Sequence, residues 1–255
     1  MFNSDNLRLD GKCAIITGAG AGIGKEIAIT FATAGASVVV SDINADAANH
    51  VVDEIQQLGG QAFACRCDIT SEQELSALAD FAISKLGKVD ILVNNAGGGG
   101  PKPFDMPMAD FRRAYELNVF SFFHLSQLVA SEMEKNGGGV ILTITSMAAE
   151  NKNINMTSYA SSKAAASHLV RNMAFDLGEK NIRVNGIAPG AILTDALKSV
   201  ITPEIEQKML QHTPIRRLGQ PQDIANAALF LCSPAASWVS GQILTVSGGG
   251  VQELN

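Results

Sequence analysis

Residues 13–42 read CAIITGAGAGIGKEIAITFATAGASVVVSD, and this stretch decides the fold. The apolar run Cys13–Thr17 leads into the glycine-rich segment Thr17–Gly24, and a stretch of helical character then precedes a second apolar run, Ser37–Ser41. Glycines permit a sharp turn, and the free N–H groups at the start of the next helix bind anions such as a pyrophosphate. A glycine-rich loop alone is often only a turn, but a strand before it and a helix after it favour a dinucleotide-binding unit.

The second apolar run ends at Asp42, about twenty residues beyond the glycines. A carboxylate at this position accepts hydrogen bonds from the adenine ribose hydroxyls and repels a 2′-phosphate. The next residue, Ile43, is not basic, and neither Ala19 nor Ala21 supplies a cation. These residues favour NAD over NADP as the cofactor, whereas the alternative interpretation of Asp42 is an ordinary loop aspartate.

The same alternation of apolar runs and helical stretches continues along the chain. Strands are expected at Cys13–Thr17, Ser37–Ser41, Ala62–Cys67, Ile91–Asn94, Val140–Thr145, Arg183–Ile187 and Gln242–Val246. Helices are expected at Gly22–Thr33, Ala45–Leu58, Glu72–Leu86, Met108–Lys135, Ser158–Gly178 and Pro221–Leu231. Continuously apolar strands alternating with helices predict a parallel sheet with helices on both faces.

We find no linker, repeat or low-complexity segment, so one α/β domain is expected over residues 1–255. Its predicted architecture is a single-domain Rossmann fold, with a seven-stranded doubly wound parallel sheet and helices on both faces. The stretch Thr194–Arg217 interrupts the rhythm before the last strand. We expect it to be partly helical and to form a lid integrated into the domain.

Composition limits the classes of partner. Apolar residues make up 46% of the 255 residues, and the net charge is −6, with no basic run to neutralise phosphates, so nucleic acid is not expected as a partner. The first twelve residues lack the apolar core of a signal peptide, and no apolar run approaches the roughly 18 residues of a membrane span. We therefore expect a soluble cytoplasmic protein without a membrane partner.

Cysteine and histidine residues give no pattern of a metal site or a disulfide framework. The four cysteines include no C-x-x-C pair, and buried free thiols are expected at Cys13, Cys65, Cys67 and Cys232. The histidines show no ligand spacing, so we assign no metal to His50, His124, His168 and His212.

Tyr159 and Lys163 lie four residues apart in an expected helix, and Ser146 precedes Tyr159 by thirteen positions. Side chains four apart stack on one helix face. A tyrosine with its ordinary pKa of about 10 is a poor base at neutral pH, and the Lys163 ammonium is expected to lower that pKa. The trio suits proton transfer to and from an alcohol or carbonyl oxygen, although Tyr-x-x-x-Lys is common by chance and also fits a solvated helix face.

Together these motifs resemble those of the classical short-chain dehydrogenase/reductase family. The matching residues occur in the family order: TGAGAGIG at 17–24, Asp42, Asp68-Ile69, NNAG at 94–97, Asn118, Ser146, Tyr159-x-x-x-Lys163, Pro189-Gly190, Thr194 and SGQILTVSGG at 240–249. One departure is Ser247, where the family usually has aspartate. The resemblance spans residues 12–250 and implies a nicotinamide-dependent oxidoreductase.

The resemblance also implies roles for individual residues. Tyr159 is expected to be the catalytic acid and base, Lys163 to bind the nicotinamide ribose and Ser146 to bind the substrate oxygen. Asn118 is expected to hold a water linked to Lys163, the alternative being a helix kink. Cofactor contacts are expected from Gly18, Ile23, Gly24, Asp42, Ile43, Asp68, Ile69, Asn95, Tyr159, Lys163, Ile192, Leu193 and Thr194. For the apolar positions among these, core packing is the alternative.

The substrate is expected to contact Gly99, Ser146, Asn151 and Tyr159. The run of the sequence most resembles the family members that oxidise hydroxysteroids, which implies NAD-dependent oxidation of the 7α-hydroxyl of a bile acid. The alternatives are an NADPH-linked 3-oxoacyl-carrier-protein reductase and a non-catalytic dinucleotide-sensing scaffold. The resemblance further implies a homotetramer, in which the helices that carry Asn118 and Tyr159 pair across a subunit interface.

Overall fold

A seven-stranded sheet forms the centre of the molecule. The structure is a computed structural model, and it describes residues 4–211 and 213–250. All neighbouring strands are parallel, in the order β3-β2-β1-β4-β5-β6-β7. The strands are β1 (Cys13–Thr17), β2 (Ser37–Asp42), β3 (Gln61–Arg66), β4 (Ile91–Asn94), β5 (Gly139–Ile144), β6 (Ile182–Pro189) and β7 (Ile243–Val246). The strand order reverses between β1 and β4, and ligands bind in the crevice at such a reversal.

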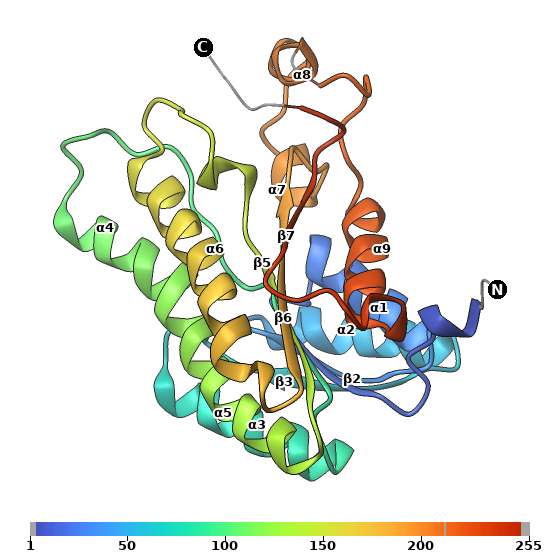
Figure 1. The fold of residues 1–255 in the computed structure, drawn as a ribbon. Coiled ribbons are helices and arrows are strands. Elements are labelled where there is room, and N and C mark those ends of the chain that lie inside the picture. The colour runs from blue at the N-terminus through green and yellow to red at the C-terminus, as the bar shows by residue number, and fades with distance from the viewer. Residues whose placement is uncertain (1–3, 212, 251–255) are drawn as a thin grey trace.

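Helices cover both faces of the sheet, as Figure 1 shows. One face carries α1 (Gly22–Thr33), α2 (Ala45–Gln57) and α9 (Pro221–Cys232), and the other carries α3 (Glu72–Leu86), α5 (Ser121–Lys135) and α6 (Thr157–Gly178). The remaining helices are α4 (Met108–Tyr115), α7 (Asp195–Lys198) and α8 (Pro203–Gln211), with short 3-10 turns at Ser4–Leu7, Met147–Ala149 and Pro234–Ala236. This is the predicted single-domain Rossmann fold with a doubly wound parallel sheet.

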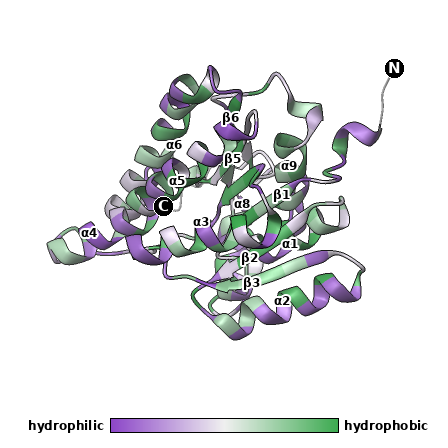
Figure 2. Cartoon of the chain, turned by 90° about the horizontal axis from the view of Figure 1, so that it is seen from below, coloured by the Kyte–Doolittle hydropathy of each residue, from purple (hydrophilic) through white to green (hydrophobic). Residues whose placement is uncertain are grey.

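The core consists of two apolar layers, one on each face of the sheet. Val38 and Val40 of β2 pack with Phe31 of α1 on one face, while Val39 packs with Leu78 of α3 on the other. Successive strand residues point to opposite faces, so a strand covered by helices on both sides must be apolar throughout. Figure 2 shows this distribution, with hydrophilic stretches on α2 and α4 at the outside of the molecule.

Helix ends follow the local sequence. The side chain of Asn44 accepts a hydrogen bond from the Ala47 N–H at the start of α2, and Ser71 does the same for the Glu74 N–H at the start of α3. Gly87 ends α3 in the left-handed conformation, at φ 79°. These caps satisfy backbone groups that have no partner inside the helix. The expected bounds of all seven strands agree with the structure to within two residues.

One expected element was wrong. The helix predicted over Met108–Lys135 is divided by a π-helical turn, Glu116–Phe120, into α4 and α5. A π turn adds a residue to one helical turn and is frequent at functional sites. Here the turn contains Asn118, whose buried side-chain amide makes hydrogen bonds to other segments.

The segment Thr194–Arg217 is partly helical, as expected, and contains α7 and α8. Neither helix has a buried residue, and the side chains of Val200 and Ile205 are 64% and 39% exposed. The apolar side chains of this segment therefore do not close fully on the protein itself. Within the described residues, no helix combines the length and the apolar character that crossing a membrane requires.

Candidate active site

The glycine-rich loop lies against the end of β4. Gly18 has φ 60°, and a Cβ atom on it would lie 2.8 Å from the Ala96 Cα. A Cβ on Gly24 would overlap the Gly18 carbonyl oxygen and the Asn95 amide. Ala21 precedes α1 and offers no side-chain cap, so N–H groups of the first turn stay available for an anion. The loop therefore needs glycine at these positions to bring the two strand ends together.

Asp42 ends β2 beside this loop. Its carboxylate accepts hydrogen bonds from the Gly20 N–H and the Asn44 N–H, each at 2.9 Å. A Cβ on Gly20 would lie 2.9 Å from the Asp42 carboxyl carbon. The carboxylate is thus oriented by two backbone donors at the carboxyl edge of the sheet. Ile43, the next residue, is 60% exposed at the same edge.

Asn95 fastens the glycine-rich loop to β4. Its side-chain amide donates to the carbonyl oxygens of Thr17 and Gly18, both at 2.9 Å. The Thr17 hydroxyl in turn accepts from the Asn95 and Ala96 N–H groups at 3.1 and 3.0 Å. Asn94 points instead into the core and donates to the Ser126 hydroxyl at 3.1 Å. The first motif of the sequence and the NNAG motif are therefore one structural unit.

Asp68 and Ile69 follow β3 at the same edge. One Asp68 carboxylate oxygen accepts from the N–H and the hydroxyl of Thr70, at 2.9 and 2.8 Å, and these bonds lower the pKa of Asp68. Ile69 lines a small cavity together with Thr17, Ala96 and residues of α5. Ile69 therefore lies near the carboxyl end of β1, where the adenosine half of a dinucleotide is expected.

Ser146 and Tyr159 meet as the spacing predicts. Ser146 lies just after β5, accepts a hydrogen bond from the Ala148 N–H at 3.1 Å and is hydrogen bonded through its side chain to Tyr159. Burial raises the pKa of Tyr159, and the bond with Ser146 lowers it in part. The sequence predicts that the Lys163 charge lowers this pKa; in the structure burial is the largest influence, and it acts in the opposite direction.

Lys163 is buried, with an exposed fraction of 6%. Its ammonium donates to the Ile144 carbonyl oxygen at 2.9 Å and lies 6.0 Å from the centre of the Tyr159 ring. Burial lowers the pKa of Lys163 to about 8, because desolvation disfavours the charged form. The side chain is thus held next to Tyr159, although no direct bond to the phenol forms.

Asn118 connects three segments around this pair. Its amide donates to the Gly98 carbonyl oxygen at 2.9 Å and to the Ser162 hydroxyl at 3.1 Å, and its oxygen accepts from the Gly98 N–H at 2.9 Å. Ser162 donates to the Tyr159 carbonyl oxygen at 2.7 Å. A Cβ on Gly97 would lie 2.8 Å from Asn118 Oδ1 and 3.3 Å from Lys163 Nζ, so these two side chains meet there.

Gly99 packs against Tyr159, and Asn151 lies in the loop that follows β5. A Cβ on Gly99 would lie 2.6 Å from Tyr159 Cδ2. The Asn151 amide nitrogen is buried and has no hydrogen-bond partner. The two loops that carry them are joined by a bond from the Lys102 N–H to the Asn155 carbonyl oxygen at 2.7 Å. An unpaired buried donor five positions after Ser146 suits an acceptor group on a ligand.

Ile192, Leu193 and Thr194 follow β6 and approach the glycine-rich loop. A Cβ on Gly22 would lie 3.3 Å from Thr194 Cγ2. The backbone of Gly219 holds this segment, since it accepts from the Leu193 N–H at 2.8 Å and donates to the Ala191 carbonyl oxygen at 2.9 Å. Thr194 also caps α7 through its hydroxyl.

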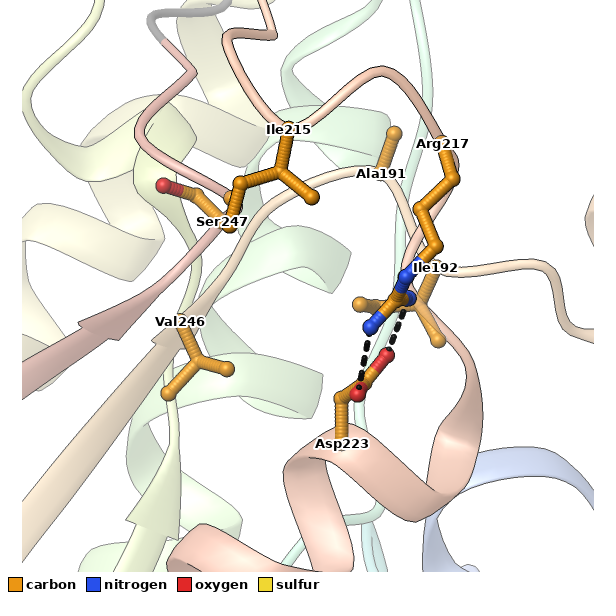
Figure 3. Close-up of a pocket in the computed structure, with 9 residues that line it drawn as sticks. Ala191, Ile192, Ile215, Arg217, Asp223, Val246 and Ser247 are labelled. Atoms are coloured by element: carbon orange, nitrogen blue, oxygen red, sulfur yellow. Dashed lines mark hydrogen bonds and ion pairs between the residues drawn. The ribbon is translucent and has the colours of Figure 1, made fainter.

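A cavity of about 170 Å³ borders this segment on the side of α9. Figure 3 shows Arg217 and Asp223 paired across one wall, at 2.6 and 2.9 Å, with Ser247 on the opposite side. Ser247 also packs against Gly190, because a Cβ on that glycine would lie 2.9 Å from it. The ion pair fixes the segment that supports Ile192, and none of Ser146, Tyr159 and Lys163 lines the cavity.

Among residues 4–211 and 213–250, no three His, Cys, Asp or Glu side chains are grouped as metal ligands. His212 lies outside the described residues. All four cysteines are free thiols, three of them buried and Cys65 partly buried. Burial raises the pKa of Cys67 and of Cys232 to about 12, which leaves both in the unreactive thiol form.

The residues present fit a dinucleotide. Glycines form a cradle that any Cβ would fill, the first turn of α1 is uncapped, and a fixed carboxylate stands at the end of β2. A family model described as enoyl-(acyl carrier protein) reductase matches residues 18–250. A solved structure of a short-chain type dehydrogenase/reductase from Mycobacterium marinum is 37% identical with a TM-score of 0.92, over 96% of this chain and 97% of that chain. The chain belongs to the short-chain dehydrogenase/reductase family.

Two further relatives show which reactions occur within the short-chain dehydrogenase/reductase family. The crystal structure of hydroxysteroid dehydrogenase from Escherichia coli has 93% sequence identity and a TM-score of 0.89, and covers 97% of this chain and 100% of that chain. The 5-keto-D-gluconate 5-reductase of Escherichia coli K12 is 36% identical over 96% of this chain and 98% of its own length. This short-chain dehydrogenase/reductase is therefore an oxidoreductase that acts on a small-molecule substrate with a nicotinamide cofactor.

The structure also contains supporting residues that the motifs did not reveal. Ser162 connects Asn118 to the backbone of Tyr159, and Glu74 accepts a hydrogen bond from the Asp68 N–H at 2.7 Å. The position of Ser162 directly before Lys163 was the only sequence signal for its role, and no local pattern indicated the role of Glu74. Both depend on contacts between segments that are distant in sequence.

Proposed function

We propose that this oxidoreductase uses NAD to oxidise the 7α-hydroxyl of a bile acid to the 7-oxo product. The observation that carries the proposal is the 93% identity to the Escherichia coli hydroxysteroid dehydrogenase, which is matched over its whole length. The hydrogen-bonded Ser146–Tyr159 pair with Lys163 beside it supports the chemistry, because it supplies a group that exchanges a proton with an alcohol.

Each residue of the pair has a distinct task in this proposal. Tyr159 accepts the hydroxyl proton from the substrate, while Ser146 hydrogen bonds to the same oxygen as the C–O bond becomes a carbonyl. Bound NAD supplies the acceptor for the hydride of the carbinol carbon. Because burial raises the pKa of Tyr159, its phenolate needs a cation nearby, and the ammonium of Lys163 provides one. Asn118 meets Lys163 near Gly97. In the proposal it holds a water that links the Lys163 ammonium to solvent.

The cofactor would lie across the crevice at the carboxyl ends of β1 and β4. Asp42 binds the adenine ribose hydroxyls and repels a 2′-phosphate. Lys163 and Tyr159 hydrogen bond the nicotinamide ribose, and Ile192 and Thr194 hold the carboxamide and phosphate. The remaining contacts come from Gly18, Ile23, Gly24, Ile43, Asp68, Ile69, Asn95 and Leu193.

The substrate would lie between the Gly99 loop, the Asn151 loop and the lid over residues 194–217. The free amide of Asn151 donates to an oxygen of the bile acid, and Gly99 leaves room beside Tyr159. Exposed apolar side chains of the lid, such as Val200 and Ile205, cover the flat apolar steroid. Burying them against a ligand removes apolar surface from water, which favours closure.

We further propose a cytoplasmic homotetramer. Four free thiols suit a reducing compartment. Large apolar side chains stand exposed on α5 and α6, including Phe123 at 37% and Phe175 at 91%. Exposed aromatic groups of this size are typical of contact surfaces between subunits. Pairing through these helices would bury the outer side of the elements that carry Asn118 and Tyr159.

The decisive experiment measures NADH formation with 3α-, 7α-, 7β- and 12α-hydroxy bile acids as separate substrates. We expect turnover only with the 7α-hydroxyl compounds. A parallel assay follows NADPH-dependent reduction of a 3-oxoacyl thioester, since the matching family model is described as a carrier-protein reductase. Turnover of the thioester with no oxidation of any bile acid would overturn the proposal in favour of that activity. Tyr159→Phe serves as the control that links turnover to this site.

A further inference from the structure

Arg66 is the last residue of β3 and lies beside Asp42. In the pairing of β2 with β3, Asp42 is the direct partner of Arg66. Neighbouring strands are about 4.8 Å apart, and paired residues of parallel strands point to the same face. The Arg66 side chain therefore emerges at the position where Asp42 would meet the adenine ribose. Its side chain is 50% exposed.

Glu74 holds this guanidinium away. Glu74 lies in the first turn of α3, and its Oε2 atom accepts from Arg66 Nη1 and from the Asp68 N–H, each at 2.7 Å. The backbone bond fixes the carboxylate after β3, so the guanidinium is drawn toward α3. The Asp68 N–H, and after it the Arg66 guanidinium, hold the pKa of Glu74 below its usual range, so the carboxylate is charged at neutral pH.

The two charges form a surface ion pair, and such pairs contribute little to stability because both groups stay hydrated and are screened by salt. A 2′-phosphate carries a charge of about −1.5 to −2 and three acceptor oxygens, which suit the fork of a guanidinium. Such a group would compete well with Glu74 for Arg66. The sequence neighbour Ile43 and the loop residues Ala19 and Ala21 are uncharged and supply no cation for such a phosphate.

We propose that Arg66 is a latent ligand for the 2′-phosphate of NADP, and that Glu74 supports the preference for NAD by holding Arg66 in an ion pair. Two carboxylates then exclude NADP by different means. Asp42 repels the phosphate directly, whereas Glu74 occupies the cation that would otherwise bind it. This inference rests on the proposed preference for NAD.

The test measures dissociation constants of NAD and NADP by titration calorimetry. The starting variant is Asp42→Ser, which removes the repulsion and leaves room for a phosphate. Adding Glu74→Gln frees Arg66 while its amide oxygen still accepts from the Asp68 N–H. We expect NADP to bind this double variant 3- to 10-fold more tightly than Asp42→Ser alone. Adding Arg66→Ala should remove the whole gain, with the NAD affinity of each variant as the internal reference.

A matched control separates this effect from a change of net charge. The control adds Asp10→Asn to Asp42→Ser and frees Arg8 from a similar exposed ion pair, in which Arg8 Nη2 lies 2.6 Å from Asp10 Oδ1. This pair lies next to Gly35, just before β2, and so at the end of that strand opposite to Asp42. We expect no gain in NADP affinity from it. The inference fails if Glu74→Gln and Asp10→Asn have the same effect, or if Arg66→Ala leaves the gain intact. A wild-type protein that binds NADP more tightly than NAD would instead contradict the proposed cofactor, whatever the variants do.

Discussion

Tyr159 is the residue on which the proposed chemistry depends, and its surroundings set two opposing influences on its proton. Burial raises its pKa and stabilises the neutral phenol, while the hydrogen bond from Ser146 stabilises the phenolate. Lys163 beside the ring is buried too, and burial lowers its own pKa. Neither Tyr159 nor Lys163 therefore has its ordinary pKa.

Replacing Tyr159 with phenylalanine removes the hydroxyl and keeps the ring. We expect kcat/KM to fall by at least about 10²–10⁴-fold, because acid–base catalysis contributes that much. The dissociation constant of the cofactor should change little, since the phenol makes one of many cofactor contacts in the proposal. Steady-state rates and calorimetric binding of NAD measure the two effects. Turnover close to that of the wild type would contradict the assignment of Tyr159.

Lys163→Met tests the cost of the buried ammonium. The folded pKa is about 8 and the ordinary value is 10.5, so between these values the unfolded state binds more protons and stability rises with pH. Below pH 8 the buried ammonium of Lys163 is charged and destabilises the folded state to the full extent. We therefore expect the variant to be more stable than the wild type at pH 7 by roughly 1–3 kcal/mol, after subtraction of the lost hydrogen bond to Ile144. Activity should be lost.

Urea unfolding of both proteins at pH 7 and pH 10 measures this difference, which should shrink as the pH rises. Lys180→Met is the control, because the Lys180 side chain is 41% exposed and pairs with Glu134 at the surface. Equal stability differences at the two pH values for Lys163→Met would contradict the lowered pKa.

At the scale of the elements, a hydrogen bond from Asn118 to Ser162 connects the π turn to α6. Ser161 and Ser162 both donate to the carbonyl oxygen three residues earlier, but Ser162 alone of the two also accepts from Asn118. We expect Ser162→Ala to lower kcat about 5- to 50-fold and to shift the pH profile of kcat/KM, with KM nearly unchanged. Ser161→Ala is the matched control and should behave as the wild type. Equal effects of the two substitutions would show that Ser162 only stabilises the helix.

The loop after β4 makes a second prediction at this scale. Gly99 has φ 151°, and a methyl group there would lie 2.6 Å from the Tyr159 ring, whereas Gly100 has no atom within 4 Å of such a methyl. Gly99→Ala should lower kcat/KM at least tenfold by displacing Tyr159, at a cost of roughly 1–3 kcal/mol in stability. Gly100→Ala should have little effect in the same assay and in thermal unfolding. Normal activity of Gly99→Ala would contradict the close packing of the loop on Tyr159.

At the scale of the whole molecule, the exposed aromatic side chains predict assembly. Phe175 is 91% exposed on α6, and we expect Phe175→Ser to weaken the proposed tetramer by removing apolar surface from the contact. Sedimentation velocity should then detect smaller species at low micromolar concentration. Leu58→Ser, at the end of α2 and 68% exposed, is the control on the other face of the sheet. A wild-type protein that sediments as a monomer would contradict the proposed assembly.

The order of strands and helices was predictable because it depends on local patterns. A strand covered on both faces must be apolar throughout, so runs such as Ser37–Asp42 stand out in the sequence. The π turn at Glu116–Phe120 was not predictable, because its single extra residue leaves the helical pattern of the segment unchanged. Its stability depends on partners such as Gly98, twenty positions away.

Local sequence patterns were enough to predict the fold, the glycine cradle and the trio of Ser146, Tyr159 and Lys163, because periodicity and residue spacing act within one element or between consecutive elements. The three-dimensional packing was needed to see that burial dominates the pKa of Tyr159, and that Glu74 binds Arg66, the strand partner of Asp42. Burial and ion pairing arise where segments distant in sequence meet. Desolvation and hydrogen bonding depend on those three-dimensional neighbours, which no local pattern of residues specifies.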